Sequence, residues 1–162
     1  MTRSELERQV RDAFRGLCYP GDENLVGRES SSHTDVCDPE SVEIKKLFSG
    51  KQWDEITRDH LCDTPQAIAF LSSKGFVYYL PAILLATLGF EPKTAYFRDN
   101  FIATLTPHKG NQQRFLHIVR ALNDEQKQII ANYLTFVTQE LYSGHPVGEA
   151  QIALDRYWNR HL

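Results

Sequence analysis

The stretch from Phe70 to Phe90 constrains the fold more than any other part of the chain. It reads FLSSKGFVYYLPAILLATLGF and has no charged side chain between Lys74 and Glu91. A helix that is apolar on all sides is buried either in a protein core or in lipid. A membrane span needs about 20 apolar residues, whereas the uncharged run 75–90 has sixteen residues and contains a proline. The stretch therefore predicts a buried core helix and no membrane association.

Local signals define this central helix further. Ser72 or Ser73 is suited to its N-cap and Gly89 to its C-cap. Pro81 removes one backbone donor, so the helix is expected to kink near Val77 or to restart there. Two apolar stripes follow from the spacing, one formed by Phe76, Tyr79, Leu80, Ile83, Leu84 and Leu88 and the other by Val77, Tyr78, Pro81 and Leu85.

Amphipathic helices are predicted on both sides of the central helix. Before it, the pattern indicates helices over about 5–16, 39–49 and 53–61 and from residue 65, with Ser4 and Glu7 spaced as a capping box for the first. After it, helices are expected around 97–105, from Asn111, from a capping box of Asn123 and Gln126 to about residue 142, and near the C-terminus. No convincing strand pattern occurs. The sequence predicts an all-α fold, with residues 1–162 forming one irregular, orthogonal bundle of about eight helices around the Pro-kinked helix.

Composition excludes several classes of function. The net charge is −3 and the pI about 6.1, which argues against nucleic-acid binding because that affinity rests on many Lys and Arg contacts to phosphate. The charged N-terminal sequence lacks the apolar region of a signal peptide, so a cytoplasmic location is expected. Three cysteines, an odd number, argue against a disulfide framework and favour reduced thiols.

Acidic residues are concentrated upstream of the central helix. A long loop is expected over about 18–38, and between Cys18 and Glu43 only Arg28 opposes the acidic residues Asp22, Glu23, Glu29, Asp35, Asp38, Glu40 and Glu43. The local net charge is therefore −6, which leaves +3 for the rest of the chain. Polar loops and helix N-termini are often acidic, but charge segregation of this kind also accelerates encounter with a basic partner. These seven residues are the predicted partner-binding surface.

Catalytic and metal-binding patterns are weak. Cys18, His33, Cys37, His60 and Cys62 could in principle supply zinc ligands, but their spacing matches no short zinc motif. Glu55, Asp59 and His60 are better interpreted as a solvated helix face, and His60 and Cys62 point in different directions on a helix. The sequence predicts no catalytic residue, no metal and no cofactor. A candidate pocket beside the central helix would have Trp53, Tyr78 and Tyr79 as its walls, although such tyrosines are more often core residues.

Several segments resemble a family of bacterial proteins of unknown function with a Tyr-Tyr-Leu-Pro-Ala signature. The signature here is Phe76-Val77-Tyr78-Tyr79-Leu80-Pro81-Ala82, preceded by Trp53 and followed by Gln126 in the long helix. The resemblance covers about Phe48 to Phe136, and an extent over the whole chain stays open. It implies a compact helical bacterial protein and carries over no activity and no catalytic residue.

Two classes of function stay open. The first is a non-enzymatic cytosolic protein-binding module that docks on a basic partner through the acidic surface, as a bacterial immunity protein does with a toxin. The alternative is a small-ligand binder or an enzyme that uses a pocket beside the kinked helix. A cavity with converging polar groups favours the alternative.

Overall fold

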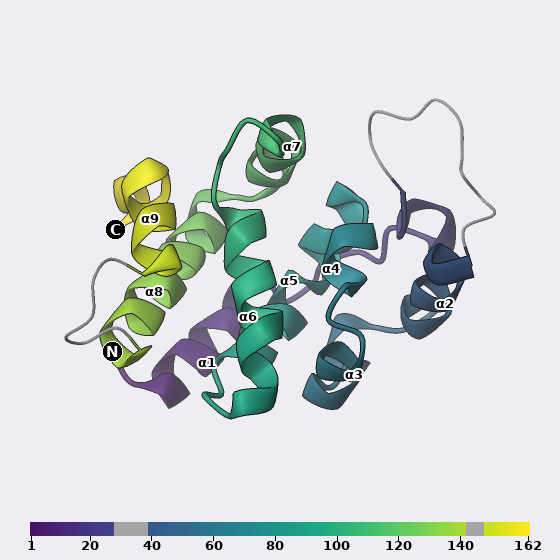
Figure 1. Ribbon diagram of the computed structural model, residues 1–162, viewed down its shortest axis with the longest axis horizontal. Helices are drawn as coiled ribbons and strands as arrows, with labels where there is room; N and C mark the ends of the chain where they lie inside the picture. The colour runs from purple at the N-terminus through teal and green to yellow at the C-terminus, as the bar shows by residue number, and fades with distance from the viewer. Residues whose placement is uncertain (28–38, 142–147) are drawn as a thin grey trace.

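The apolar stretch forms helix α5, Ser73–Thr87, in the computed structural model, which describes residues 1–27, 39–141 and 148–162 (Figure 1). All of its residues are buried except Lys74 and Leu85. The hydroxyl of Ser72 caps the helix by accepting the Gly75 N–H at 2.9 Å, as expected. The helix runs through Pro81 without interruption, so the alternative of a restart at Val77 is excluded.

The C-terminal end of α5 differs from the prediction. Leu88 is the C-cap, and Gly89 does not adopt the left-handed conformation of a glycine cap, so the assignment of Gly89 was wrong. Its carbonyl oxygen instead accepts hydrogen bonds from the Thr94 hydroxyl at 2.9 Å and from Arg98 Nη1 at 3.1 Å. A cation at this position is favourable because the C-terminal end of a helix carries partial negative charge.

The described residues form eight further helices. They are α1 (Arg3–Ala13), α2 (Pro39–Phe48), α3 (Arg58–Asp63), α4 (Ala67–Phe70), α6 (Pro92–Leu105), α7 (Gln112–Ala121), α8 (Asp124–Leu141) and α9 (Glu149–Arg156), joined by the 3₁₀ turns η1 (Asp22–Asn24), η2 (Trp53–Glu55) and η3 (Trp158–His161). Helices α1, α3, α6 and α7 and turn η2 pack on α5, while α8 packs on α1, α9 and η3. Figure 1 shows α8 and α9 on one side of α6 and α2, α3 and α4 on the other. Within the three described ranges there are nine helices and no strand, and the predicted all-α single domain is confirmed.

Two helix starts differ from the sequence prediction. Helix α1 is capped by Thr2, whose hydroxyl accepts the Glu5 N–H at 3.2 Å, so the proposed capping box of Ser4 and Glu7 was wrong. The segment 53–61 is not one helix, because the extended backbone of Ile56 and Thr57 separates η2 from α3.

The cap at the start of α8 was predicted correctly. The Asn123 N–H donates to Gln126 Oε1 at 3.1 Å, and the Gln126 N–H donates to Asn123 Oδ1 at 2.8 Å. This reciprocal pair is the capping box that the sequence indicates.

A short pairing ties the chain after α1 to the start of α5. Val26 and Leu71 form an isolated antiparallel bridge, with the Gly27 N–H donating to Phe70 O at 3.2 Å and the Ser72 N–H to Leu25 O at 2.8 Å. Gly75 lies so close to this pairing that a Cβ atom at its position would collide with the Leu25 carbonyl. The absence of a side chain at Gly75 therefore permits the contact.

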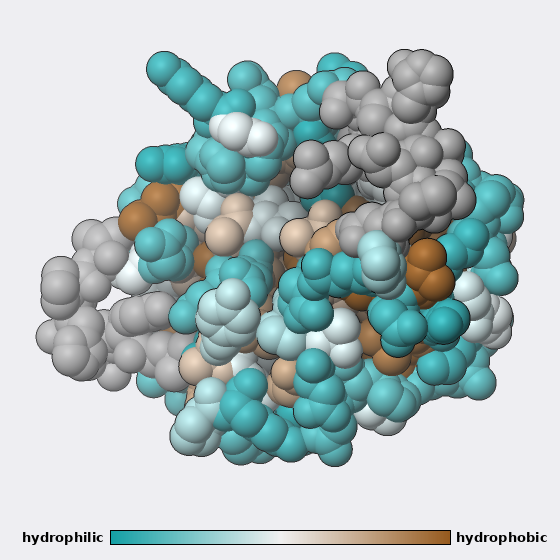
Figure 2. Space-filling view, turned by 45° about the vertical axis from the view of Figure 1, so that its right-hand side comes forward, coloured by the Kyte–Doolittle hydropathy of each residue, from teal (hydrophilic) through white to brown (hydrophobic). Residues whose placement is uncertain are grey.

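One hydrophobic cluster contains buried residues from every helix. Outside the grey atoms, hydrophilic side chains cover most of the face in Figure 2, and hydrophobic ones come to the surface in small groups. None of the helices in the described ranges combines the length and apolar character that crossing a bilayer requires.

Candidate functional site

Four of the seven predicted acidic residues belong to the described residues, and Glu29, Asp35 and Asp38 lie outside them. Asp22 is engaged within the protein: its carboxylate accepts the hydroxyl of Tyr19 and the Gly50 N–H, the latter at 3.1 Å. The hydrogen bond from Tyr19 is the main cause that lowers the pKa of Asp22 below its ordinary value. Asp22 thus anchors the turn after α1 to the end of α2.

The other described acids differ in their surroundings. Glu23 accepts a hydrogen bond from Asn24 Nδ2 at 3.1 Å. Glu43 lies on α2 with 74% of its side chain exposed and pairs with Lys46 at 3.3 Å. Glu40 occupies the first turn of α2, where a carboxylate is favoured by the helix dipole. Lys45 and Lys46 follow on the same helix, so the charge of α2 is balanced.

The two signature tyrosines hold the turn that follows α2. Tyr79 is fully buried, and its hydroxyl lies 2.7 Å from Phe48 O and 2.9 Å from Lys51 O. Tyr78 is 2% exposed, and its hydroxyl donates to Gln52 Oε1 at 2.7 Å. Burial is the main cause that raises the pKa of both hydroxyls. Both side chains therefore have a structural role, fixing residues 48–52 against α5.

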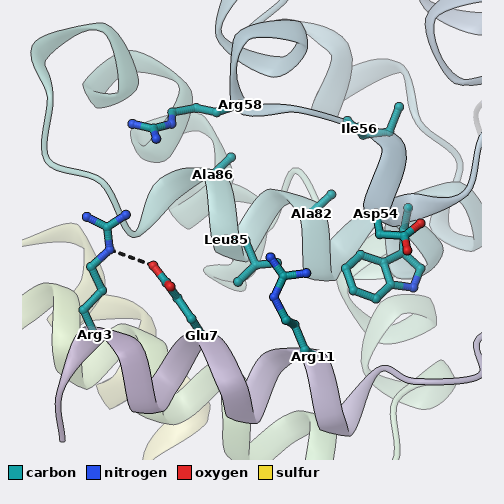
Figure 3. A pocket seen from close by; sticks show the side chains of 10 residues that line it. Arg3, Glu7, Arg11, Asp54, Ile56, Arg58, Ala82, Leu85 and Ala86 are labelled. Carbon is teal, nitrogen blue, oxygen red and sulfur yellow. Dashed lines mark hydrogen bonds and ion pairs between the residues drawn. The ribbon is translucent and has the colours of Figure 1, made fainter.

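A groove lies between α1 and α5 (Figure 3). Helix α1 contributes Arg3, Glu7 and Arg11, which are spaced i, i+4 and i+8 and therefore share one face. Helix α5 contributes the floor, formed by Ala82, Leu85 and Ala86. The opposite wall is formed by Trp53, Asp54, Ile56 and Arg58. We call these ten residues the α1–α5 groove; it includes Trp53 of the three predicted pocket walls and excludes Tyr78 and Tyr79.

Two caps fix the wall of the groove that carries Trp53 and Arg58. The Gln52 N–H donates to Glu55 Oε2 at 2.5 Å across η2. At the start of α3, the His60 N–H donates to Thr57 Oγ1 at 3.3 Å, and the Thr57 N–H donates to His60 Nδ1 at 3.2 Å. His60 is thus a capping residue, and its Nδ1 atom is occupied as an acceptor.

Two of the three groove arginines have carboxylate partners within the protein. Arg3 Nε lies 2.8 Å from Glu7 Oε1, and Arg58 Nη1 lies 2.5 Å from Glu91 Oε1. The Arg58 guanidinium lowers the pKa of Glu91 through this hydrogen bond. All four side chains are at least 37% exposed, and exposed ion pairs contribute only about 0–1 kcal/mol. An external anion could therefore replace either carboxylate at little cost.

Arg11 differs from the other two arginines. Its side chain makes no hydrogen bond or ion pair with any residue in the described ranges, although Arg8 and Arg15 on the same helix both pair with Asp12. Figure 3 shows the Arg11 side chain extending from α1 toward Ala82 and Leu85. The groove therefore holds an unpaired guanidinium above an apolar floor.

The chemistry of the groove suits binding. Its volume is about 240 Å³, slightly below the range of about 300–1,000 Å³ for drug-sized ligand pockets. Guanidinium groups stay protonated and donate hydrogen bonds in a planar fork, so they bind oxyanions and cannot act as general bases. The groove can hold a small group with an anionic head and an apolar body.

Cys18, His60 and Cys62 are not among the lining residues of this groove, and His33 and Cys37 lie outside the described residues. Burial is the main cause that raises the pKa of the Cys62 thiol, which disfavours the reactive thiolate. In the part of the chain that is described, no group of three or more His, Cys, Asp or Glu side chains is arranged to hold a metal ion.

Sequence reasoning missed the charged residues of the groove. The spacing of Arg3, Glu7 and Arg11 places them on one face of α1, and this signal was available in the sequence. What could not be predicted is that this face lies opposite Trp53 and Arg58, because helix packing brings these residues together.

Comparison with known proteins places the chain in a family. A family of unknown function (DUF6714) matches residues 2–162, and the chain belongs to this family. No curated protein and no solved structure matches the sequence. The match confirms the predicted membership of a family of unknown function.

Proposed function

We propose that this family member is a non-enzymatic binding module whose ligand occupies the α1–α5 groove. The observation that carries the proposal is the unpaired Arg11 guanidinium above the apolar floor of α5. Small-ligand sites are usually apolar with a few polar groups; the accessible lining of this groove is mostly polar, so its charged groups carry the recognition. The ligand is a small molecule or a side chain of a partner protein that fits a groove of about 240 Å³.

The lining favours binding over catalysis. Glu7 is paired with Arg3, and Asp54 is the other acid of the lining. General acid–base chemistry needs a group whose pKa lies near the working pH, and arginine is far from that condition. We therefore assign the arginines to recognition and charge neutralisation.

The test is an NMR titration with small amphipathic fragments, both charged and neutral. The protein contains two tryptophans, and the Trp53 indole lies in the groove while the buried Trp158 indole N–H donates to Leu105 O at 2.7 Å. Fragments that occupy the groove should shift the Trp53 indole resonance and leave that of Trp158 in place. Replacing the half-buried Leu85 by Phe should fill the floor and abolish the shift. The proposal fails if no fragment shifts the Trp53 resonance, or if L85F responds as the wild type does.

A second candidate function is docking on a basic protein through the acidic segment, as in an immunity protein. It is supported by the local net charge of −6 between Cys18 and Glu43. Because Asp22 is structurally engaged, the test reverses Glu23, Glu40 and Glu43 to Lys and leaves Asp22 intact. Binding to a basic test protein should weaken and lose its salt dependence. The matched control reverses Asp124, Glu125 and Glu140 on α8, and equal effects of the two triple variants would remove this surface from consideration.

The cellular setting is part of the same proposal. We propose a cytoplasmic bacterial protein with the Tyr-Tyr-Leu-Pro-Ala helix as a family signature. Its support is the resemblance given above together with the free thiols of Cys18 and Cys62, which suit a reducing compartment. Thiol labelling of protein taken directly from cells tests the compartment, since both thiols should be reduced.

A further inference from the structure

We infer that the α1–α5 groove selects ligands that carry a compact oxyanion, a carboxylate or a phosphate, next to a short apolar group. This inference rests on the proposed binding function and specifies the chemistry of its ligand. Three observations support it: the charge of the lining, the internal carboxylates on the rim and the composition of the floor.

Cations face the groove from both of its walls. Arg3 and Arg11 come from α1, and Arg58 comes from the first position of α3. Against them stand Glu7 and Asp54, so the ten lining residues carry a net charge of +1. Guanidinium groups bind carboxylate and phosphate oxygens through two parallel hydrogen bonds. Arg11 is exposed, so water solvates its guanidinium in the free protein, and an oxyanion can replace this water with charge-assisted hydrogen bonds that a neutral ligand cannot form.

The internal ion pairs show which chemistry these arginines accept. Arg3 holds the carboxylate of Glu7 at 2.8 Å, and Arg58 holds that of Glu91 at 2.5 Å. Both carboxylates are supplied by the protein and are partly exposed to solvent. Glu91 therefore competes with the ligand for Arg58, as Glu7 does for Arg3, and Arg11 is the arginine without such a competitor in the described residues.

The floor limits the rest of the ligand. Ala82 and Ala86 are only 4% and 5% exposed, so most of the apolar surface of the floor comes from the half-buried Leu85. Together with the Trp53 indole they offer apolar surface beside the arginines. Asp54 lies next to Trp53 and repels a second negative charge at that end. The groove thus suits one anionic head and one apolar body, and disfavours a ligand that is charged at both ends.

Three probes test the inference: 3-phenylpropionate, phenyl phosphate and the neutral 3-phenylpropan-1-ol. The readout is the Trp53 indole resonance, with that of Trp158 as the internal reference. Both anions should shift the Trp53 resonance with dissociation constants at least about tenfold lower than that of the alcohol, and added salt should weaken their binding. A preference between the two anions identifies the head group as carboxylate or phosphate.

Charge variants locate the interaction. Arg11→Gln should weaken binding of the preferred anion by about three- to tenfold, whereas Arg8→Gln, a matched change on another face of α1, should leave it unchanged. Glu91→Gln should strengthen binding because it frees Arg58. An unaltered Trp158 resonance in each variant shows that the fold is retained.

The outcomes separate the two proposals. If the alcohol binds as tightly as the anions, or if Arg11→Gln and Arg8→Gln behave alike, the oxyanion inference is overturned while the groove remains a binding site. If none of the three probes and no other fragment shifts the Trp53 resonance, the proposed function itself fails.

Discussion

Removing one hydroxyl group from the signature helix should destabilise the protein. Tyr79 is fully buried, and its hydroxyl lies 2.7 Å from Phe48 O and 2.9 Å from Lys51 O. Replacing Tyr79 by Phe keeps the ring packed against Phe48, whose centroid is 4.6 Å away, but removes the donor.

The Lys51 N–H also donates to Phe48 O, at 3.1 Å. Phe48 O therefore keeps a partner in the variant, and the partly buried Lys51 O loses the Tyr79 hydroxyl. We expect the free energy of unfolding to fall by about 0.5–1.5 kcal/mol, the net contribution of one hydrogen bond, which urea denaturation followed by circular dichroism can measure.

Tyr78→Phe is the matched control. The Tyr78 hydroxyl donates to the side chain of Gln52, a residue exposed to solvent, at 2.7 Å. Water can replace that donor, so the loss should stay below about 1 kcal/mol. The structural role assigned to Tyr79 is refuted if Tyr79→Phe costs less than about 0.5 kcal/mol or no more than Tyr78→Phe.

Three further predictions concern stability. Leu84→Ala should cost about 2–5 kcal/mol in urea denaturation because Leu84 is fully buried in α5, and a loss below about 1 kcal/mol would contradict its place in the core. Gly75→Ala should lower the free energy of unfolding by about 1–3 kcal/mol because its Cβ would displace the Leu25 carbonyl, and an unchanged urea midpoint would contradict that contact. Asp22 has a lowered pKa in the folded state, so its stabilising contribution is complete above the ordinary value of about 3.9 and is lost as the pH falls through the folded pKa. Asp22→Asn should therefore flatten the loss of stability seen in urea denaturation between about pH 4 and pH 2, and identical pH profiles would exclude this role.

Features decided by nearby residues could be predicted from the sequence. The Ser72 cap, the reciprocal pair of Asn123 and Gln126 and the burial of α5 each depend on residue types within one or two helical turns. Even so, local spacing was misleading at Glu7, because the side chain that could have capped α1 pairs with Arg3. Glu7 had two possible partners nearby in the sequence, Ser4 and Arg3, and the spacing alone does not tell which of them it contacts.

The groove could not be predicted, because it depends on contacts between distant segments. Arg58 and Glu91 are 33 residues apart, and α1 meets α5 only after the chain has passed through α2, α3 and α4. The same limit applies to Tyr79, whose burial followed from the pattern while its acceptors at Phe48 and Lys51 did not. A period-3.6 pattern identifies which side of a helix is apolar but not which helix covers it.

The pairing of Val26 with Leu71 has a consequence for the segment that it encloses. Gly27 and Phe70 are joined by a backbone hydrogen bond, so the segment between them begins and ends at nearly one point. The segment between them carries α2, η2, α3 and α4, and buried residues such as Ile44, Phe48 and Leu61 join it to the core. The pairing of Val26 with Leu71 therefore closes a folded unit, and a change that breaks it should loosen the contacts of η2 and α3 with α5 as well.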